Sequence, residues 1–456
     1  LTLQSFPYFS VVLVTGASGF VSPYIIKQLQ ENSYKVRGVV PNVDDEKKKE
    51  EKVKALQNLC PEAANKLELV EVDSSKSDAW EEPVKGCQYV IHVISPFPNK
   101  ESKDDNELVQ PAVDETLAVL KACVAAKTVK RVVMTSSSAA ITCHGDAAGD
   151  SKAFTEEAWS DPSKLDPYGK CKTLAEKAGW EYIKELPDED KIELTVINPS
   201  YVMGPVLPGT TCYSSEIVQV LLERSSLVIP KLNFAIVDVR DVASAHVKAM
   251  TLEEAAGKRF IVHANEMWMK DIAQVLAKEF KSQGYNVPTI NCPNFVLQLR
   301  SLYDKEVKKY LPQVGKIFKL DNTKMKETLG ITPKECKETI IDMAYSLIEA
   351  GVIKKTKKYK GQNAQNAAEE NADAKEDEEK KEGDNSDKPK ENGEVKEEDK
   401  AEKEETKAEE KASEEKAEEK KDEKIEEADK DKKEDSKPEN EEKAEEKKAD
   451  EPEPEK

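Results

Sequence analysis

Short apolar runs and amphipathic stretches alternate through the N-terminal half of the chain. The apolar runs that suit buried strands begin near Val11, Lys35, Leu67, Gln88, Arg131 and Ile192. The stretches between them repeat apolar residues about every three to four positions, which is typical of helices packed on one face. Strands that alternate with helices predict an α/β fold built on a parallel, doubly wound sheet.

The pattern becomes less regular after Gly204. Residues 205–235 and roughly 255–350 contain short segments of both kinds, and a helix is expected over Thr339–Ile348. We expect this part of the chain to cover a binding pocket on the first domain and to define its ligand.

Charge divides the chain more sharply than hydropathy does. From Gly361 to Lys456 there are 41 acidic residues and 22 lysines, whereas the preceding residues hold 49 acidic and 48 basic ones. The net charge of −20 therefore belongs almost wholly to the C-terminal segment and says nothing about a binding site. The segment has no aromatic residue, and Val395 and Ile425 are its sizeable aliphatic ones, so it cannot bury a core.

We expect residues 357–456 to form a mostly disordered, low-complexity tail. Glu and Lys recur three to four residues apart near residues 394–433, which predicts transient helix there. Prolines such as Pro389 and Pro438 argue against a continuous helix. A solvated extension is the simpler interpretation, and a docking segment for a basic protein partner is the alternative.

A glycine-rich turn follows the first apolar run. The segment Gly16–Ser22 joins the strand at Val11–Thr15 to a helical pattern at Pro23–Leu29. Glycines let the backbone approach a pyrophosphate, which the free amides and the dipole of the following helix attract. This order predicts a dinucleotide-binding unit, with a tight turn that binds nothing as the alternative. Ser22 stands at the third glycine position, where a small residue still permits close packing of helix and strand.

Another strand ends in small hydroxyl residues. Arg131–Thr135 leads into Ser136, Ser137 and Ser138. The active groups of open parallel sheets lie at the carboxyl ends of strands, where a serine can hydrogen-bond a substrate carbonyl oxygen. A serine-rich turn without function is the alternative.

Tyr168 and Lys172 lie four residues apart in a helical pattern that begins at Pro167. This spacing puts the phenol and the ammonium on one face of the helix. A free tyrosine has a pKa near ~10, and a neighbouring cation stabilises the phenolate and lowers that pKa. The pair therefore predicts a tyrosine suited to proton transfer, with an ordinary surface pair as the alternative.

These segments together resemble the extended short-chain dehydrogenase/reductase superfamily. Within it the chain is similar to the dihydroflavonol reductases, the cinnamoyl-CoA reductases and the fungal methylglyoxal (aldehyde) reductases. The resemblance spans about the first 350 residues and rests on Thr15–Val21, Thr135–Ser137, Tyr168–Trp180, Asn198–Pro205 and Asp238–His246. It implies a Rossmann-type NAD(P)-binding domain at 1–204 and a substrate-binding part at 205–356 that returns in part to the first domain.

The resemblance implies NAD(P)H-dependent reduction of an aldehyde or ketone to an alcohol. Tyr168 would be the general acid that protonates the carbonyl oxygen, and Lys172 would lower its pKa and hold the nicotinamide ribose. Ser137 would orient the carbonyl, with Ser136 and Ser138 as competitors. The nicotinamide ring would supply the hydride.

The resemblance also implies where the cofactor binds. Asp73 and Ser74, after the strand at Leu67–Val72, would reach the adenine, and Val90–Ser95 would pass beneath the cofactor. The cofactor-binding residues that it implies are Gly16, Ser18, Gly19, Phe20, Val21, Asp73, Ser74, Tyr168, Lys172, Pro199 and Val202, of which Pro199 and Val202 would touch the nicotinamide end. Arg37 is added to them as a cation of the second strand.

Two positions depart from the family's pattern. Pro41 ends the second strand where NADPH-dependent relatives carry an arginine that grips the 2′-phosphate, and no acidic residue that would favour NAD stands there. Arg37 and Lys47–Lys49 are the nearby cations, so NADP is favoured over NAD. Glu115 stands where relatives usually carry a glycine, in a helix that faces the cofactor, which predicts an altered local geometry.

The remaining chemistry of the chain is sparse. The eight cysteines form no C-x-x-C pair, which indicates neither a zinc site nor a redox motif, and reduced thiols in a cytoplasmic protein are expected. His92 and His246 are isolated and predicted to be structural. No apolar run approaches the ~20 residues of a membrane span. We expect no signal peptide at Leu1–Ser10 and no nucleic-acid partner.

Three functions remain open. The first is the reductase of a small carbonyl substrate, as a monomer or homodimer. The second is a sugar-nucleotide epimerase or dehydratase, or a hydroxysteroid dehydrogenase, on the same fold. The third is a non-catalytic cofactor-binding scaffold with an interaction tail. The Ser-Tyr-Lys set favours an enzyme, and Val202–Pro205 with Asp238–His246 favours the reductases, whereas Pro41 and Glu115 keep the scaffold open.

Overall fold

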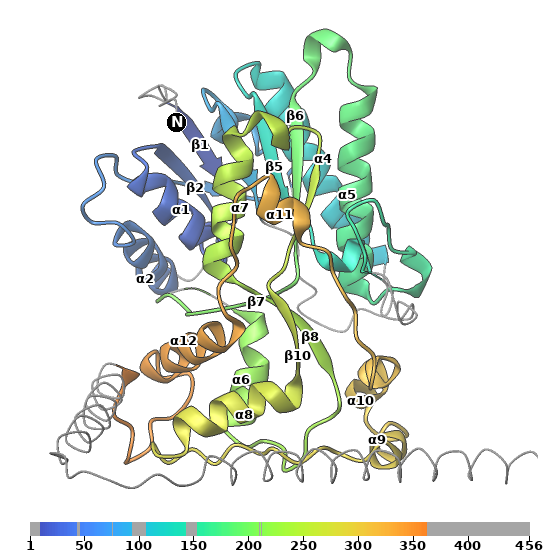
Figure 1. Ribbon diagram of the computed structural model, residues 1–456. Helices are drawn as coiled ribbons and strands as arrows, with labels where there is room; N and C mark the ends of the chain where they lie inside the picture. Colours follow the sequence, from blue (N-terminus) through green and yellow to red (C-terminus); the bar gives the residue numbers. More distant parts are fainter. Residues whose placement is uncertain are drawn as a thin grey trace, which may run out of the picture. The chain divides into compact units, whose positions relative to one another are not determined.

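Seven parallel strands form the main sheet of the computed structural model (Figure 1). The structure describes residues 10–42, 46–74, 76–93, 106–142, 153–208, 210 and 212–362. Across the sheet the strands are β3 (Glu68–Val72), β2 (Lys35–Pro41), β1 (Val11–Val14), β4 (Tyr89–His92), β5 (Arg131–Thr135), β6 (Glu193–Pro199) and β9 (Arg259–Val262). The strand order reverses between β1 and β4, and ligands of open α/β sheets bind at such a switch point.

Helices cover both faces of this sheet and surround a second, smaller one. They are α1 (Ser22–Glu31), α2 (Glu46–Gln57), α3 (Glu81–Val84), α4 (Asn106–Ala126), α5 (Pro167–Glu185), α6 (Glu216–Leu222), α7 (Val239–Thr251), α8 (Met269–Phe280), α9 (Asn294–Arg300), α10 (Lys305–Tyr310), α11 (Thr323–Glu327) and α12 (Cys336–Glu349).

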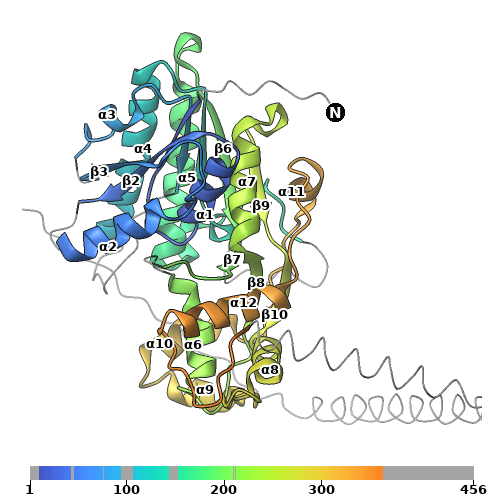
Figure 2. The ribbon, with the colours of Figure 1, turned by 90° about the vertical axis from the view of Figure 1, so that its left-hand side faces the viewer.

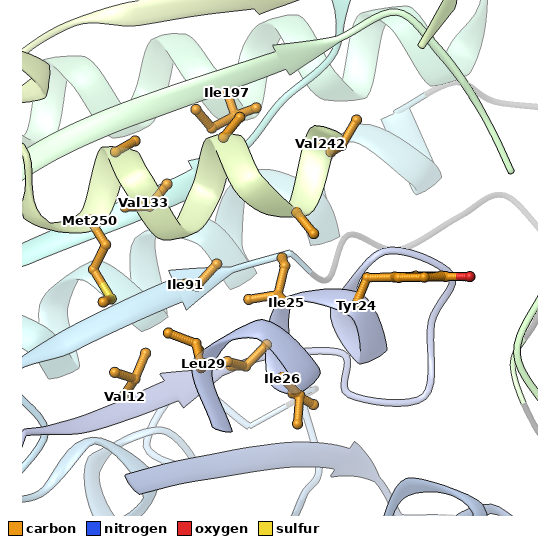
Figure 3. Packing of buried hydrophobic residues seen from close by; sticks show 14 of the residues in the cluster. Val12, Tyr24, Ile25, Ile26, Leu29, Ile91, Val133, Ile197, Val242 and Met250 are labelled. Carbon is orange, nitrogen blue, oxygen red and sulfur yellow. The ribbon is translucent and has the colours of Figure 1, made fainter. Parts of the chain in front are cut away.

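The apolar runs are buried on both sides because successive residues of a strand point to opposite faces. Val12 and Val14 of β1 belong to a core shared with α1 and α7, whereas Leu13 belongs to a core shared with α3 and α4. Figure 3 shows the first of these cores, in which α1 and α7 pack side chains against β1, β4, β5 and β6, with Val12, Tyr24, Ile25, Ile26, Leu29, Ile91, Val133, Ile197, Val242 and Met250 labelled.

A second sheet of three strands lies beside the carboxyl ends of the main one (Figures 1 and 2). It consists of β10 (Asn265–Trp268), β8 (Asn233–Asp238) and β7 (Tyr201–Met203), and its core is shared with α6, α8 and α12. β8 runs directly into α7, which returns the chain to the main sheet.

The predicted α/β fold is confirmed. All six expected strands form and begin within one residue of the expected positions, and the helix expected at Thr339–Ile348 lies within α12. The seventh strand, β9, was missed because it lies in the stretch that was interpreted as irregular. Both α7 and β9 return part of residues 205–356 to the main sheet, while the exact domain boundaries stay a prediction.

The folded part continues past residue 356. The ring of Tyr359 lies 6.3 Å from that of Tyr345 between centroids, and the backbone N–H of Lys360 donates to Gln283 Oε1 at 3.3 Å. Residues 357–362 therefore pack on the smaller sheet's lobe, and the rest of the predicted tail, with its transient helix, lies outside the described residues. No helix in the described part is both long and apolar enough to cross a membrane.

Candidate active site

The glycine-rich turn takes a shape that requires glycine. Gly16 has φ +63°, in the left-handed region, and its carbonyl accepts a hydrogen bond from the N–H of Gly19 at 2.9 Å. A Cβ on Gly19 would lie 3.2 Å from that same carbonyl oxygen. Ala17 N donates to Val39 O at 2.8 Å, which ties the turn to β2. Ser18 and Phe20 complete a backbone surface at the carboxyl end of β1.

Ser22 fits the place of the third glycine. Its side chain is fully buried, and its hydroxyl donates to the carbonyl of Thr15 at 3.1 Å. Helix α1 begins here, after Val21, without a side-chain cap and without an acidic residue in its first turn. Its first N–H groups and the positive end of its dipole therefore face the turn and suit a phosphate group.

Ser137, Tyr168 and Lys172 come together at the carboxyl end of β5. Ser137 follows that strand by two residues and hydrogen-bonds with the phenol of Tyr168. Asp166 caps α5 by accepting from Gly169 N at 2.7 Å, which places Tyr168 and Lys172 in the helix's first turns. Lys172 Nζ donates to the carbonyl of Thr135 at 3.3 Å.

Burial dominates the titration of Tyr168. Removal of the phenol from water raises its pKa, and the hydrogen bond from Ser137 lowers it only in part. The sequence predicted a pKa lowered by Lys172, and this is wrong for the protein without its ligands. Tyr168 is therefore a protonated acid at neutral pH, the form that a proton donor needs.

His246 fixes the carbonyl partner of Lys172. Its Nδ1 lies 2.7 Å from the carbonyl of Val242, which can only accept, so Nδ1 carries the proton. Nε2 is then the acceptor for the hydroxyl of Thr135, at 2.7 Å. Burial lowers the pKa of His246 to about 4, which keeps the ring neutral and preserves this arrangement. The structural role predicted for His246 agrees with these contacts.

A buried network holds the loop of Ser137, and the sequence interpretation missed it. Asn198 Nδ2 donates to the carbonyl of Ser137 at 3.2 Å and to Glu176 Oε2 at 2.9 Å. Arg259 Nε donates to Glu176 Oε1 at 2.5 Å. The position of Glu176, four residues after Lys172 on α5, was the one available signal. Nothing local in β9 indicated that Arg259 would reach it.

Three of the other predicted cofactor residues lie at the carboxyl ends of main-sheet strands, and the fourth, Val202, lies in the smaller sheet. Asp73 and Ser74 follow β3 directly, and Asp73 Oδ2 lies 3.4 Å from Lys76 Nζ. Pro199 ends β6 and is buried, and half-buried Val202 lies in β7. Of the segment expected beneath the cofactor, residues 90–93 are described and the remainder lies outside the described residues.

Arg37 does not fit the predicted phosphate-binding role. It lies four residues before the end of β2, roughly 13 Å along the strand from its carboxyl end. Its guanidinium donates to Glu68 Oε1 at 2.9 Å and to the carbonyl of Pro83 at 2.6 Å. Lys49 is paired with Glu71 at 2.7 Å. Lys47, exposed at the start of α2, is the described cation of this group without such a pairing.

The residues present fit a dinucleotide. Beyond the glycine turn and the uncapped helix, two buried oxygens near the Ser-Tyr-Lys group, Ser136 Oγ and Glu115 Oε1, lack a hydrogen-bond partner. Unsatisfied buried polar atoms are rare in folded proteins and mark places where a ligand completes the bonding. Within the described ranges no cluster of His, Cys, Asp and Glu is arranged to hold a metal ion, and the described cysteines form no disulfide with one another.

Comparison with known proteins agrees with this geometry. Residues 12–262 match the model of the NAD dependent epimerase/dehydratase family. The chain is 33% identical to the NADPH-dependent methylglyoxal reductase of Saccharomyces cerevisiae over 74% of this chain and 98% of the relative. It is 34% identical to a cinnamoyl-CoA reductase of Medicago truncatula over 56% of this chain and 76% of the relative.

Solved structures match across the same region. The yeast methylglyoxal/isovaleraldehyde reductase in complex with NADPH superposes with a TM-score of 0.60 and 30% identity, over 75% of this chain and 99% of that one. A related NADPH complex from Candida albicans gives a TM-score of 0.62 and 26% identity over the same shares.

Proposed function

The chain belongs to the NAD-dependent epimerase/dehydratase family, within the extended short-chain dehydrogenases/reductases, and we propose that it is an NADPH-dependent reductase of an aldehyde or ketone. The observation that carries the proposal is the hydrogen bond between Ser137 and Tyr168 beside buried Lys172, at the carboxyl edge where the glycine turn also lies. The yeast methylglyoxal reductase and a cinnamoyl-CoA reductase of Arabidopsis thaliana match this chain over 98% and 91% of their own lengths. Both are named as reductases, which supports the same class of enzyme.

Ser137 and Tyr168 bind and protonate the carbonyl oxygen. A carbonyl oxygen that accepts hydrogen bonds from both hydroxyls is held where the phenol can deliver its proton as negative charge develops. The raised pKa of Tyr168 keeps that proton in place until the carbonyl arrives. Bound NADPH supplies the hydride.

Lys172 stabilises the phenolate that forms when Tyr168 gives up its proton. Its ammonium lies one helical turn from the phenol and is buried, so its electrostatic effect is weakly screened. The carbonyl of Thr135 orients it, and its remaining donors suit the hydroxyls of the nicotinamide ribose.

The glycine turn and the start of α1 bind the pyrophosphate, and Asp73 with Ser74 bind the adenosine half. NADP is favoured over NAD because the yeast methylglyoxal reductase is named as NADPH-dependent and its solved structure is an NADPH complex. We assign binding of the 2′-phosphate to Lys47 in place of Arg37, because Lys47 is an exposed cation that follows the end of β2. A cytoplasmic location and a monomeric or homodimeric state belong to the same proposal.

Cofactor oxidation by the full-length protein tests the proposal. NADPH and NADH are compared against small aldehydes, α-dicarbonyls and aromatic ketones, and we expect turnover with NADPH. Tyr168→Phe should abolish turnover and keep NADPH binding. Absence of turnover with every carbonyl, or NAD that remains bound through purification as in an epimerase, would contradict the proposal.

A further inference from the structure

Glu115 is a buried carboxylate beside the site that the reductase chemistry has not used. It lies on α4 with 4% of its surface exposed, and one of its oxygens, Oε1, has no hydrogen-bond partner. The described groups that act on it are the Ser74 hydroxyl, through a hydrogen bond, and the Lys172 ammonium, through its charge.

Close packing of α4 and α5 prevents Glu115 from turning out to water. Val109 and Ala112 of α4 form one apolar cluster with Cys171 and Ala175 of α5. One turn further on, a Cβ added to Gly179 would lie 3.7 Å from the Thr116 methyl group. The two helices therefore run side by side at short distance, and the carboxylate stays inside.

Lys172 needs a counter-charge, because an unpaired ammonium is costly to bury. It is 8% exposed, and it donates a hydrogen bond to a neutral carbonyl, that of Thr135. The titratable groups that face it are Glu115 from α4, Glu176 and Cys171 from α5, and His92 from β4. Burial and Lys172 lower the pKa of His92 to about 3, so that ring stays neutral.

Glu176 is bonded to groups other than Lys172. Its two carboxylate oxygens accept from Arg259 Nε at 2.5 Å, from Asn198 Nδ2 at 2.9 Å and from Trp180 Nε1 at 3.3 Å. Its charge is thus balanced by Arg259. Among the described groups, Glu115 is therefore the acidic residue near Lys172 that is not paired with another cation.

We propose that Glu115 is a positioning residue whose carboxylate is the counter-charge of Lys172, holding the ammonium in its charged form beside Tyr168. The proposal rests on the reductase function, since it gives this chain its own means of tuning the family's proton donor. Burial raises the pKa of Glu115 to about 7 and lowers that of Lys172 to about 8, and each charge supports the other. The pair is therefore ionised together in a narrow range around neutral pH.

A double-mutant cycle on the full-length protein tests the pairing. Unfolding temperatures are measured for Glu115→Gln, Lys172→Met and the double variant at pH 7.5 and pH 5. At pH 7.5 the effects should be non-additive by on the order of 2 °C or more, because each single variant strands the other charge. At pH 5 Glu115 is protonated and the effects should become additive. Asp114→Asn, an exposed charge removal one residue away, should be additive with Lys172→Met at both pH values.

The pH profile of turnover provides the second measurement. Without the carboxylate Lys172 loses its proton more readily, so the alkaline limb of kcat for Glu115→Gln should move to lower pH by on the order of one unit. The profile of Asp114→Asn should coincide with that of the native protein. A structural role for Glu115 would lower stability and leave the profile in place.

Additive unfolding temperatures at pH 7.5 would overturn the pairing and leave the reductase function standing. The double-mutant cycle measures unfolding and needs no turnover. It therefore tests the pairing of Glu115 with Lys172 even if the protein reduces no carbonyl in the panel. Should either single variant fail to fold, Glu115→Gly and Lys172→Gln complete the same cycle.

Discussion

Two buried charge clusters lie one helical turn apart on α5 and differ in how completely they are bonded. In the first, Glu176 accepts hydrogen bonds from Arg259 and Asn198, and Arg259 also donates to the carbonyls of Glu156 and Ala158, both at 2.7 Å. Both charged groups are bonded there, and the buried atom without a partner is the neutral amide oxygen Asn198 Oδ1. In the second, Lys172 has one bond to a carbonyl, and Glu115 keeps a buried oxygen without a partner.

We interpret the fully bonded charges as groups that stabilise the fold and the incompletely bonded charges as groups that bind a ligand. A buried ion pair is tolerated when further hydrogen bonds satisfy its remaining donors and acceptors, as around Glu176. Incomplete bonding costs stability and is retained where a substrate or cofactor completes it. We therefore expect Glu176 and Arg259 to stabilise the scaffold, and we propose Lys172, Tyr168 and Glu115 for the chemistry.

Tyr168→Phe should produce the largest effect, and only on activity. Loss of a positioned proton donor lowers kcat by about 10²- to 10⁴-fold. The phenyl ring fills the same space, so the unfolding temperature and NADPH binding should stay near native values. The measurement is kcat together with thermal unfolding. A large drop in unfolding temperature would show that Tyr168 stabilises the fold and would contradict this prediction.

Arg259→Met should act in the opposite sense, on stability first. It leaves Glu176 as an uncompensated buried carboxylate, which costs about 3–5 kcal/mol of unfolding free energy. Denaturant unfolding measures this cost, and Arg224→Met, an exposed arginine on the smaller lobe, is the control. A fully stable variant would show that the bonding around Glu176 contributes nothing to the fold.

Glu115→Gln should change how stability depends on pH. The folded pKa of about 7 lies above the ordinary 4.5, so folded Glu115 keeps its proton in this window, and native stability falls as pH rises through it. The glutamine variant lacks this loss, which reaches up to about 3 kcal/mol by pH 8, and gives back part of the gain because its Lys172 has no counter-charge. At pH 4 the two should be equal. Unfolding free energies across this range are the measurement, and parallel curves would contradict it.

Lys47→Ala should have the smallest effect, because Lys47 is exposed whereas the charges of the two clusters are buried. A solvent-screened cation contributes about 1 kcal/mol to a phosphate contact, so the Kd for NADPH should rise about fivefold. The Kd for NADH, which lacks the 2′-phosphate, should not change. Equal weakening of both cofactors would remove Lys47 from the proposed phosphate site.

The sequence alone determined the elements and the local chemistry. Strand positions from Val11 to Ile192 follow from apolar runs, the turn at Gly16 follows from its glycines, and the shared face of Tyr168 and Lys172 follows from helical spacing. Each of these depends on residues within one or two turns of each other, where periodicity is reliable.

Only the tertiary structure decided which buried charges meet. Arg259 reaches Glu176 across 83 residues of sequence, and Glu115 meets Lys172 because two separate helices pack on one face of the sheet. Tertiary contacts also orient Arg37. Its hydrogen bonds to Glu68 and to the carbonyl of Pro83 hold the guanidinium away from the carboxyl edge of the sheet. Such contacts are set by the stacking of distant segments and by the burial that follows, and local pattern carries no record of either.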